Sequence, residues 1–226
     1  MRMRRKKHLD ERLDACSDII ISMYREERNF SASVQQKDYI NIEKLFGNKN
    51  PIYLEIGCGK GKFASELAKN NPEINIIAVE KTSNVIVEAA ERAKSEGVTN
   101  LKFLLGPAEY LPIFIKDKSV SRIYLNFSCP FPKKRYASHR LTHKNFLEIY
   151  KNIMNDTAEI HQKTDNTHFF EFSIEQFTQS GFALKNVTFD LHSSGFEDNI
   201  MTEYEERFTK EGLNIYRLEA YLNQEK

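Results

Sequence analysis

The 226-residue sequence has no tryptophan, only three cysteines and no long apolar stretch. Cys16, Cys58 and Cys129 are far apart and odd in number, which argues against a disulfide framework and against a closely spaced metal site. The basic N-terminus lacks the apolar core of a signal peptide, and no run of residues could span a membrane. We therefore expect a reduced, cytoplasmic protein whose aromatic packing depends on its 16 phenylalanines and 10 tyrosines.

The net charge of only +1 hides two clusters of basic residues. Residues 1–12 contain six basic and two acidic side chains, and residues 133–144 contain five basic side chains and no acid. Clusters of this kind are typical of nucleic-acid interfaces. A solvated basic surface is the alternative for each cluster taken alone.

Strand-like and helix-like segments alternate from residue 52 onward. Strands are predicted at 52–56, 75–79, 101–105, 122–127, 157–163, 184–191 and 214–222. Between them, helices are predicted at about 62–70, 82–96, 108–116, 142–154 and 167–180, the third of these being a helix or a loop. This alternation predicts an α/β, Rossmann-like fold with a mainly parallel, seven-stranded sheet and helices on both faces.

The domain organisation predicted from the sequence is simple. Residues 1–50 are expected to form a basic arm and a lead-in helix, and residues 51–226 a single domain without internal repeats. The segment 128–140 is too polar and too interrupted by proline for either a helix or a strand.

A glycine-rich turn follows the first predicted strand. Gly57, Gly59 and Gly61 occupy every second position between that strand and a helix. Such turns bind nucleotide-like ligands, because missing Cβ atoms let the backbone approach and the helix N-terminus offers free N–H groups. Lys62 stands where a dinucleotide fingerprint has its next glycine, which favours S-adenosylmethionine over NAD. A tight turn without a ligand would have the same pattern.

Polar residues also mark the ends of later strands, where doubly wound sheets bind their ligands. Glu80 ends the second strand, 23 residues beyond Gly57, at the position whose carboxylate accepts hydrogen bonds from ribose hydroxyls. A surface glutamate is the alternative. Asp165 ends the fifth strand and is expected either to face a ligand or to cap the next helix.

Five segments together resemble the bacterial tRNA (guanine-N7)-methyltransferase family, and the resemblance covers nearly the whole chain. They are residues 55–61, 126–135, 161–166, 190–192 and 202–205, and the opening residues 1–4 are similar as well. The resemblance implies a class I methyltransferase fold. It also implies methyl transfer from S-adenosyl-L-methionine to N7 of a variable-loop guanine in tRNA. We further expect a monomer or homodimer that binds neither a metal nor a membrane.

The resemblance also implies the roles of individual residues. Cys129 and Asp165 would be the catalytic residues. The cofactor would be bound by Glu55, Gly57, Gly59, Glu80, Pro107 and Cys129. The guanine nucleotide would be bound by Lys133, Asp165, Thr202, Glu203, Tyr204 and Glu205.

Three positions depart from the family pattern. Cys129 replaces an aspartate, and Phe131 replaces a tryptophan. Pro107 stands where the family tends to place an acidic residue, and Glu109 is close enough in sequence to take the place of that acid. A thiol is mostly neutral at pH 7 and accepts hydrogen bonds weakly, so we expect a slower enzyme than the aspartate would give. Guanine N7 carries a lone pair and no proton, so catalysis should depend on positioning instead of a general base.

Three other functions stay open from the residues. A catalytically weakened paralogue that still binds tRNA would account for Cys129. A small-molecule methyltransferase would explain the glycine turn and Glu80 but not the two basic clusters. An NAD-dependent oxidoreductase is disfavoured by Lys62.

Overall fold

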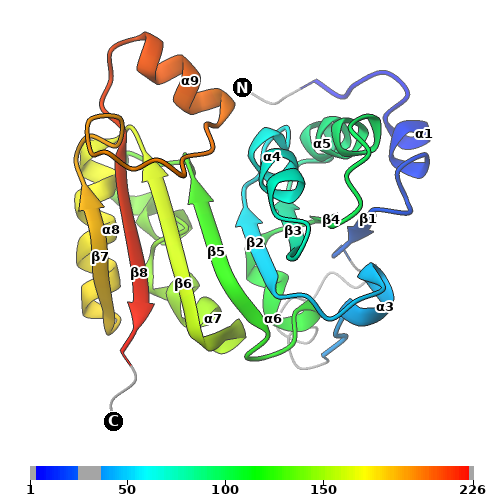
Figure 1. Ribbon diagram of the computed structural model, residues 1–226, viewed down its shortest axis with the longest axis horizontal. Coiled ribbons are helices and arrows are strands. Elements are labelled where there is room, and N and C mark those ends of the chain that lie inside the picture. The colour runs from blue at the N-terminus through cyan, green and yellow to red at the C-terminus, as the bar shows by residue number, and fades with distance from the viewer. Residues whose placement is uncertain (1–3, 25–36, 224–226) are drawn as a thin grey trace. The chain divides into compact units, whose positions relative to one another are not determined.

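The computed structural model describes residues 4–24 and 37–223, which belong to two compact units, residues 1–114 and 115–226 (Figure 1). Arg2 of the predicted basic arm and part of the lead-in segment, residues 25–36, lie outside the described residues. No helix in the described ranges is long and apolar enough to cross a membrane. A cytoplasmic location remains a prediction.

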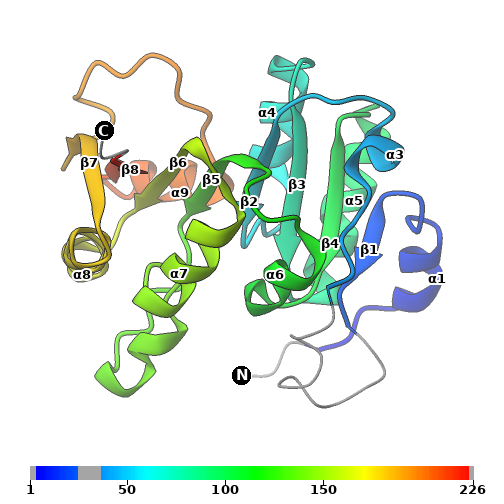
Figure 2. The ribbon, with the colours of Figure 1, turned by 90° about the horizontal axis from the view of Figure 1, so that it is seen from below.

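The first unit is built on four parallel strands in the order β1-β4-β3-β2. Its strands are β1 (Ile20–Ser22), β2 (Ile52–Ile56), β3 (Asn75–Glu80) and β4 (Leu101–Leu105). Its helices are α1 (Leu9–Asp14), α3 (Ile42–Phe46), α4 (Lys62–Asn70), α5 (Ser83–Ser95), the short 3-10 helix η1 (Ala108–Tyr110) and α6 (Leu111–Phe114). β3 is buried almost throughout, as expected for a strand covered on both faces. Figure 2 shows α4 and α6 on opposite faces of this sheet.

The second unit combines parallel and antiparallel pairing. β5 (Val120–Asn126) runs parallel to β6 (Met154–Thr164), which pairs antiparallel with β8 (Tyr216–Leu222), and β8 pairs antiparallel with β7 (Phe182–Thr188). Its helices are the 3-10 helix η2 (Lys134–His139), α7 (Lys144–Ile153), α8 (Thr167–Gln179) and α9 (Glu203–Lys210). α7 and α8 cover one face of this sheet (Figure 2), where they bury Tyr150, Phe169, Phe170 and Phe177. Phenylalanine and tyrosine supply the large core side chains in place of tryptophan.

The α/β fold with a mainly parallel sheet is confirmed, and the seven predicted strands are all present. The predicted number of strands was wrong, since the described residues contain eight. The additional strand is β1, which has three residues and pairs with β4 through Ile20 and Phe103. It lies within residues 1–50, so this stretch contributes to the sheet, whereas the domain division at residue 50 remains a prediction. The segment 128–140 was expected to lack helix but contains η2, a 3-10 helix.

Candidate functional site

The turn between β2 and α4 holds three glycines in the left-handed region, with φ values of 82° at Gly57, 56° at Gly59 and 73° at Gly61. A Cβ on Gly61 would lie 2.7 Å from the Cβ of Ala89, so this glycine lets α4 pack against α5. A Cβ on Gly57 or Gly59 would meet no atom within 4 Å. These two glycines therefore border open space at the carboxyl end of β2.

The glycine turn is fastened to the end of β3. The backbone N–H groups of Gly57 and Cys58 both donate to the carbonyl oxygen of Val79, at 2.8 and 3.1 Å. Glu55 is buried at the end of β2. Burial raises the pKa of the Cys58 thiol well above its ordinary value, and the charges of Glu55 and Glu80 raise it further. Cys58 is therefore a neutral side chain that packs within the turn.

Glu80 ends β3 with a fixed carboxylate. Its Oε1 accepts a hydrogen bond from the backbone N–H of Thr82 at 2.9 Å, which holds the side chain at the start of α5. Tyr24 lies nearby and donates its hydroxyl to the carbonyl oxygen of Lys81 at 3.0 Å. Partial burial raises the pKa of Tyr24, and the charges of Glu80 and Glu109 contribute. Glu80 and Glu109 therefore both lie near Tyr24, a residue that no sequence motif marks.

Pro107 directly precedes η1, and its backbone is extended. It follows β4 by two residues, and its side chain is half-buried, whereas Glu109 on η1 is exposed. The structure thus places Glu55, Gly57, Gly59, Glu80 and Pro107 at the carboxyl ends of β2, β3 and β4 in the first unit.

In the second unit, the segment after β5 carries two strained residues on either side of Cys129. Phe127 and Phe131 have φ values of 49° and 40°, a region that costs a non-glycine residue about 1–2 kcal/mol. The N–H of Phe127 donates to the carbonyl of Lys163 at 2.8 Å, and Arg140 donates to the carbonyl of Phe131 at 3.0 Å. These two bonds fix the segment at both ends. Cys129 is exposed between them.

The basic cluster at 133–144 is interleaved with aromatic rings. Lys133, Lys134 and Arg135 are exposed, and the guanidinium of Arg135 lies 4.8 Å from the ring centroid of Tyr136. His139 lies 6.1 Å from Tyr136, centroid to centroid. Exposed cations beside stacking rings are typical of surfaces that bind RNA.

Several basic side chains of residues 4–12 form ion pairs with acidic side chains of the same unit. Lys6 pairs with Glu88 and Arg12 with Glu91, both on α5, and the Arg12 guanidinium donates two hydrogen bonds of 2.7 and 2.6 Å. Arg5 pairs with Asp10. This part of the arm is therefore docked on the first unit, and its contribution to a nucleic-acid interface remains a prediction.

Asp165 follows β6 immediately and does not cap the next helix. The N-cap of α8 is Asn166, whose side-chain oxygen accepts from the N–H of Phe169 at 2.8 Å. Asp165 is half-buried, and burial is the main cause that raises the pKa of its carboxyl group. Of the two expectations for Asp165, the capping role is excluded, and the ligand-facing role stays a prediction.

The segment 202–205 begins α9, near the carboxyl ends of β5 and β6 (Figure 1). Thr202 is the N-cap and accepts from the N–H of Glu205 at 3.0 Å. Glu203 and Tyr204 are exposed, and the Tyr204 ring stacks on Phe127 with 6.4 Å between centroids. Glu205 is fully buried, and its carboxylate accepts hydrogen bonds from Lys163 and Asn199.

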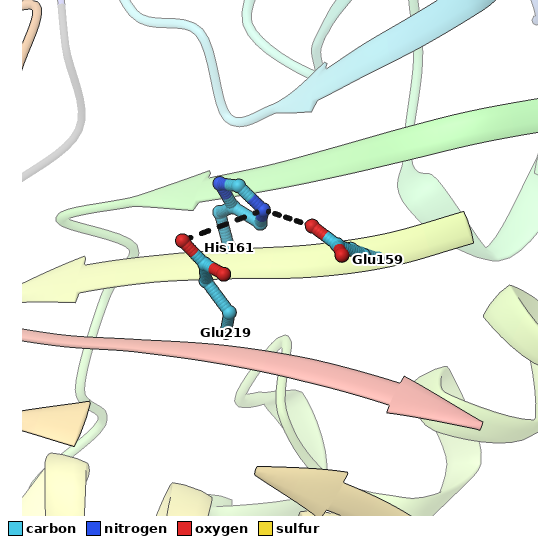
Figure 3. A group of neighbouring side chains, drawn as sticks. All are labelled: Glu159, His161 and Glu219. Atoms are coloured by element: carbon cyan, nitrogen blue, oxygen red, sulfur yellow. Dashed lines mark hydrogen bonds and ion pairs between the residues drawn. The ribbon is translucent and has the colours of Figure 1, made fainter. Parts of the chain in front are cut away.

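A separate polar cluster lies farther along β6 and β8. In Figure 3, His161 lies between Glu159 and Glu219, and its Nε2 is 2.8 Å from Glu159. The three side chains are close enough to hold a metal ion. Burial lowers the pKa of His161 from 6.5 to about 4 despite the opposing bond to Glu159, so the ring is neutral and Nε2 carries the proton donated to that carboxylate.

Cations already neutralise both glutamates of this cluster. Lys185 pairs with Glu159, and Arg217 pairs with Glu219. A metal ion would have to displace these partners and the Nε2 proton of His161. We therefore interpret the cluster as an ion-pair network of the second unit instead of a metal site.

The class of protein follows from the fold and from a comparison of families. Residues 49–218 match the family model Methyltransf_4, which describes methyltransferases. The crystal structure of the 16S rRNA methyltransferase KamB has a TM-score of 0.60 at 15% identity, over 83% of this chain and 96% of that one. The fold and the family model together define a methyltransferase with Rossmann-like architecture.

Relatives at higher identity narrow this class. The tRNA (guanine-N(7)-)-methyltransferase of Brevibacillus brevis is 49% identical over 181 residues, which is 80% of this chain and 85% of the relative. The enzyme of the same name from Bacillus cytotoxicus is 42% identical over 220 residues, covering 97% of this chain and 96% of the relative. The chain belongs to the tRNA (guanine-N7)-methyltransferase family, which confirms the resemblance seen in its motifs.

Proposed function

We propose that this protein transfers a methyl group from S-adenosylmethionine to N7 of a guanine in the variable loop of tRNA. The main support is the relative from Bacillus cytotoxicus, which is named a tRNA (guanine-N(7)-)-methyltransferase and matches nearly the full chain. Several of the polar residues on which the motif resemblance rests lie at or near the carboxyl ends of strands within each unit.

The residues of the first unit fit the cofactor. Gly57 and Gly59 border open space that a Cβ would enter, which suits a ligand lying against the backbone. Glu80 offers an oriented carboxylate for ribose hydroxyls, and Glu55 and Pro107 line neighbouring strand ends. Bound S-adenosylmethionine supplies a sulfonium-activated methyl group.

The residues of the second unit suit the acceptor. N7 of guanine needs no deprotonation, and the methylated base is cationic, so its binding site should orient the base and offset positive charge. In this proposal Asp165, which follows β6, has this role together with Thr202 and Tyr204 at the start of α9. Cys129 stands where the family has an aspartate. Its thiol orients the base and offsets the positive charge less well than a carboxylate would.

Lys133, Lys134 and Arg135 supply phosphate contacts in this proposal, and Tyr136 a stacking surface. Their exposure beside aromatic rings supports an RNA partner over a small molecule, which would have no use for this surface.

Purified protein, tritiated S-adenosylmethionine and bulk tRNA test the proposal. We expect label to enter tRNA and to be recovered as N7-methylguanosine after nucleoside digestion. Binding of tRNA and of the cofactor without transfer would instead support a weakened tRNA-binding paralogue, the second candidate, which Cys129 favours. Transfer to another nucleoside would contradict both.

A further inference from the structure

α9 is held by a buried charge in addition to the aromatic contacts that its Tyr204 and Phe208 make with Phe127. Among its eight residues, all of which the structure describes, Glu205 is the buried one. Glutamate is almost never fully buried unless its charge is paired. The position of this helix therefore depends in part on the partners of the Glu205 carboxylate.

Those partners come from two other segments of the second unit. Lys163, near the end of β6, donates to Oε2 of Glu205 at 2.6 Å. It also donates to Oδ1 of Asn199 at 3.1 Å and to the carbonyl of Ile200 at 2.8 Å. Asn199 in turn donates to Oε1 of Glu205 at 2.5 Å. One ammonium group thus joins β6, the segment before α9, and α9 itself.

His192 contributes to the same junction from the segment after β7. Its Nε2 lies 3.4 Å from Oε1 of Glu205 and 3.1 Å from Oγ1 of Thr209, at the far end of α9. Both oxygens of Glu205 are therefore engaged by protein groups, and the side chain is fully buried. A carboxylate with these contacts is poorly placed to bind a guanine base directly.

We propose that Lys163 and Glu205 are positioning residues for the methyl acceptor, an inference that rests on the proposed function. Lys163 lies two residues before Asp165, and Glu205 lies three residues after Thr202 and is next to Tyr204. The ion pair fixes these acceptor-binding side chains relative to one another. In this proposal Glu205 acts through Lys163 and α9 and does not touch the guanine, unlike the direct contact that the family resemblance implies.

Lys163→Met tests this role, because methionine keeps most of the side-chain volume and removes the charge. Glu205→Gln is the reciprocal variant, which keeps the shape of the carboxylate. Lys185→Met is the matched control, since it also removes a lysine paired with a glutamate in the same sheet, but away from α9. The measurements are amide hydrogen exchange, the affinities for tRNA and for S-adenosylhomocysteine, and kcat and KM for tRNA.

We expect Lys163→Met and Glu205→Gln to accelerate amide exchange over residues 199–210 and to leave α7 and α8 protected. The value of kcat/KM for tRNA should fall about 100-fold, as for a reacting group displaced by about 1 Å. The affinity for S-adenosylhomocysteine should change less than about twofold, and the control should behave as wild type.

Unchanged exchange over 199–210 would overturn the anchoring role. Faster exchange with unchanged kcat, KM and tRNA affinity would overturn the positioning role. A wild-type protein that binds tRNA but transfers no methyl group would refute the proposed function separately. In that case, loss of tRNA affinity in Lys163→Met with faster exchange over 199–210 would still support the anchor.

Discussion

Substituting alanine for each of three glycines distinguishes an effect on cofactor binding from an effect on the stability of the fold. Gly59, Gly61 and Gly97 all have left-handed backbones, with φ values of 56°, 73° and 67°. A side chain in this region costs about 1–2 kcal/mol. Gly97 follows the C-cap of α5, and a Cβ there would meet no atom within 4 Å. Gly97→Ala should therefore lower the free energy of unfolding by this strain alone and leave cofactor binding unchanged.

Gly61→Ala should destabilise the protein more. Its Cβ would lie 2.7 Å from the Cβ and 3.1 Å from the Cα of Ala89, so α4 or α5 has to shift. Overpacking of this kind adds about 1–3 kcal/mol, for a total of about 2–5 kcal/mol. Urea denaturation of the three variants measures these differences.

Gly59→Ala should be about as stable as Gly97→Ala, because no protein atom crowds its Cβ. Its affinity for S-adenosylmethionine, measured by calorimetry, should fall about tenfold or more, since the methyl group enters the space assigned to the ligand. Wild-type affinity in Gly59→Ala would refute the assignment of this space. Equal stability of Gly61→Ala and Gly97→Ala would refute the packing argument.

Three further predictions concern the second unit. Cys129→Asp should raise kcat for tRNA methylation, by up to about 10²-fold if the carboxylate stabilises the transition state as strongly as an oxyanion-hole donor does. Cys129→Ser is the control. If the Asp variant is slower than wild type with unchanged affinities, the site has adapted to the thiol and the prediction is wrong. Lys134→Ala should weaken tRNA binding and flatten the plot of log affinity against log salt by about 0.9, or about 0.7 at single-stranded contacts, whereas an unchanged slope would make Lys134 a solvated charge. Burial depresses the pKa of His161 from 6.5 to about 4, so the unfolded chain binds more protons between these values and stability falls as pH drops through this window. His161→Gln should remove about 3 kcal/mol of that fall, measured as unfolding free energies at pH 7 and pH 4, and an identical loss in both proteins would contradict the shift.

Much of the first unit could be predicted because its strands are short apolar runs between clear turn signals. The bounds expected for β2 and β4 agree with the structure. Pro51 and the glycine turn lie at the two ends of β2, and Gly97 and Gly106 lie close to the two ends of β4. β1 was missed because three residues show no periodicity. The role of Gly61 in packing also needed the structure, since its partner Ala89 is remote in sequence.

In the second unit, the missed features depend on contacts between distant residues. The segment around Glu205 has the composition of an exposed helix start, and its burial follows from Lys163, 42 residues earlier in the chain. Adjacent Asp165 and Asn166 are both good capping residues, so the sequence alone could not decide which one caps α8. The charge pairs of the basic arm with α5 were likewise invisible in composition.

The most direct test of the proposed activity uses a tRNA whose variable-loop guanine is replaced by 7-deazaguanine. This base keeps the shape and pairing edge of guanine but has a carbon in place of N7, so it lacks the nucleophile. With labelled S-adenosylmethionine, the account predicts methyl transfer to the unmodified tRNA and none to the substituted one, although both bind. Equal methylation of the two tRNAs would contradict transfer to N7 of that guanine.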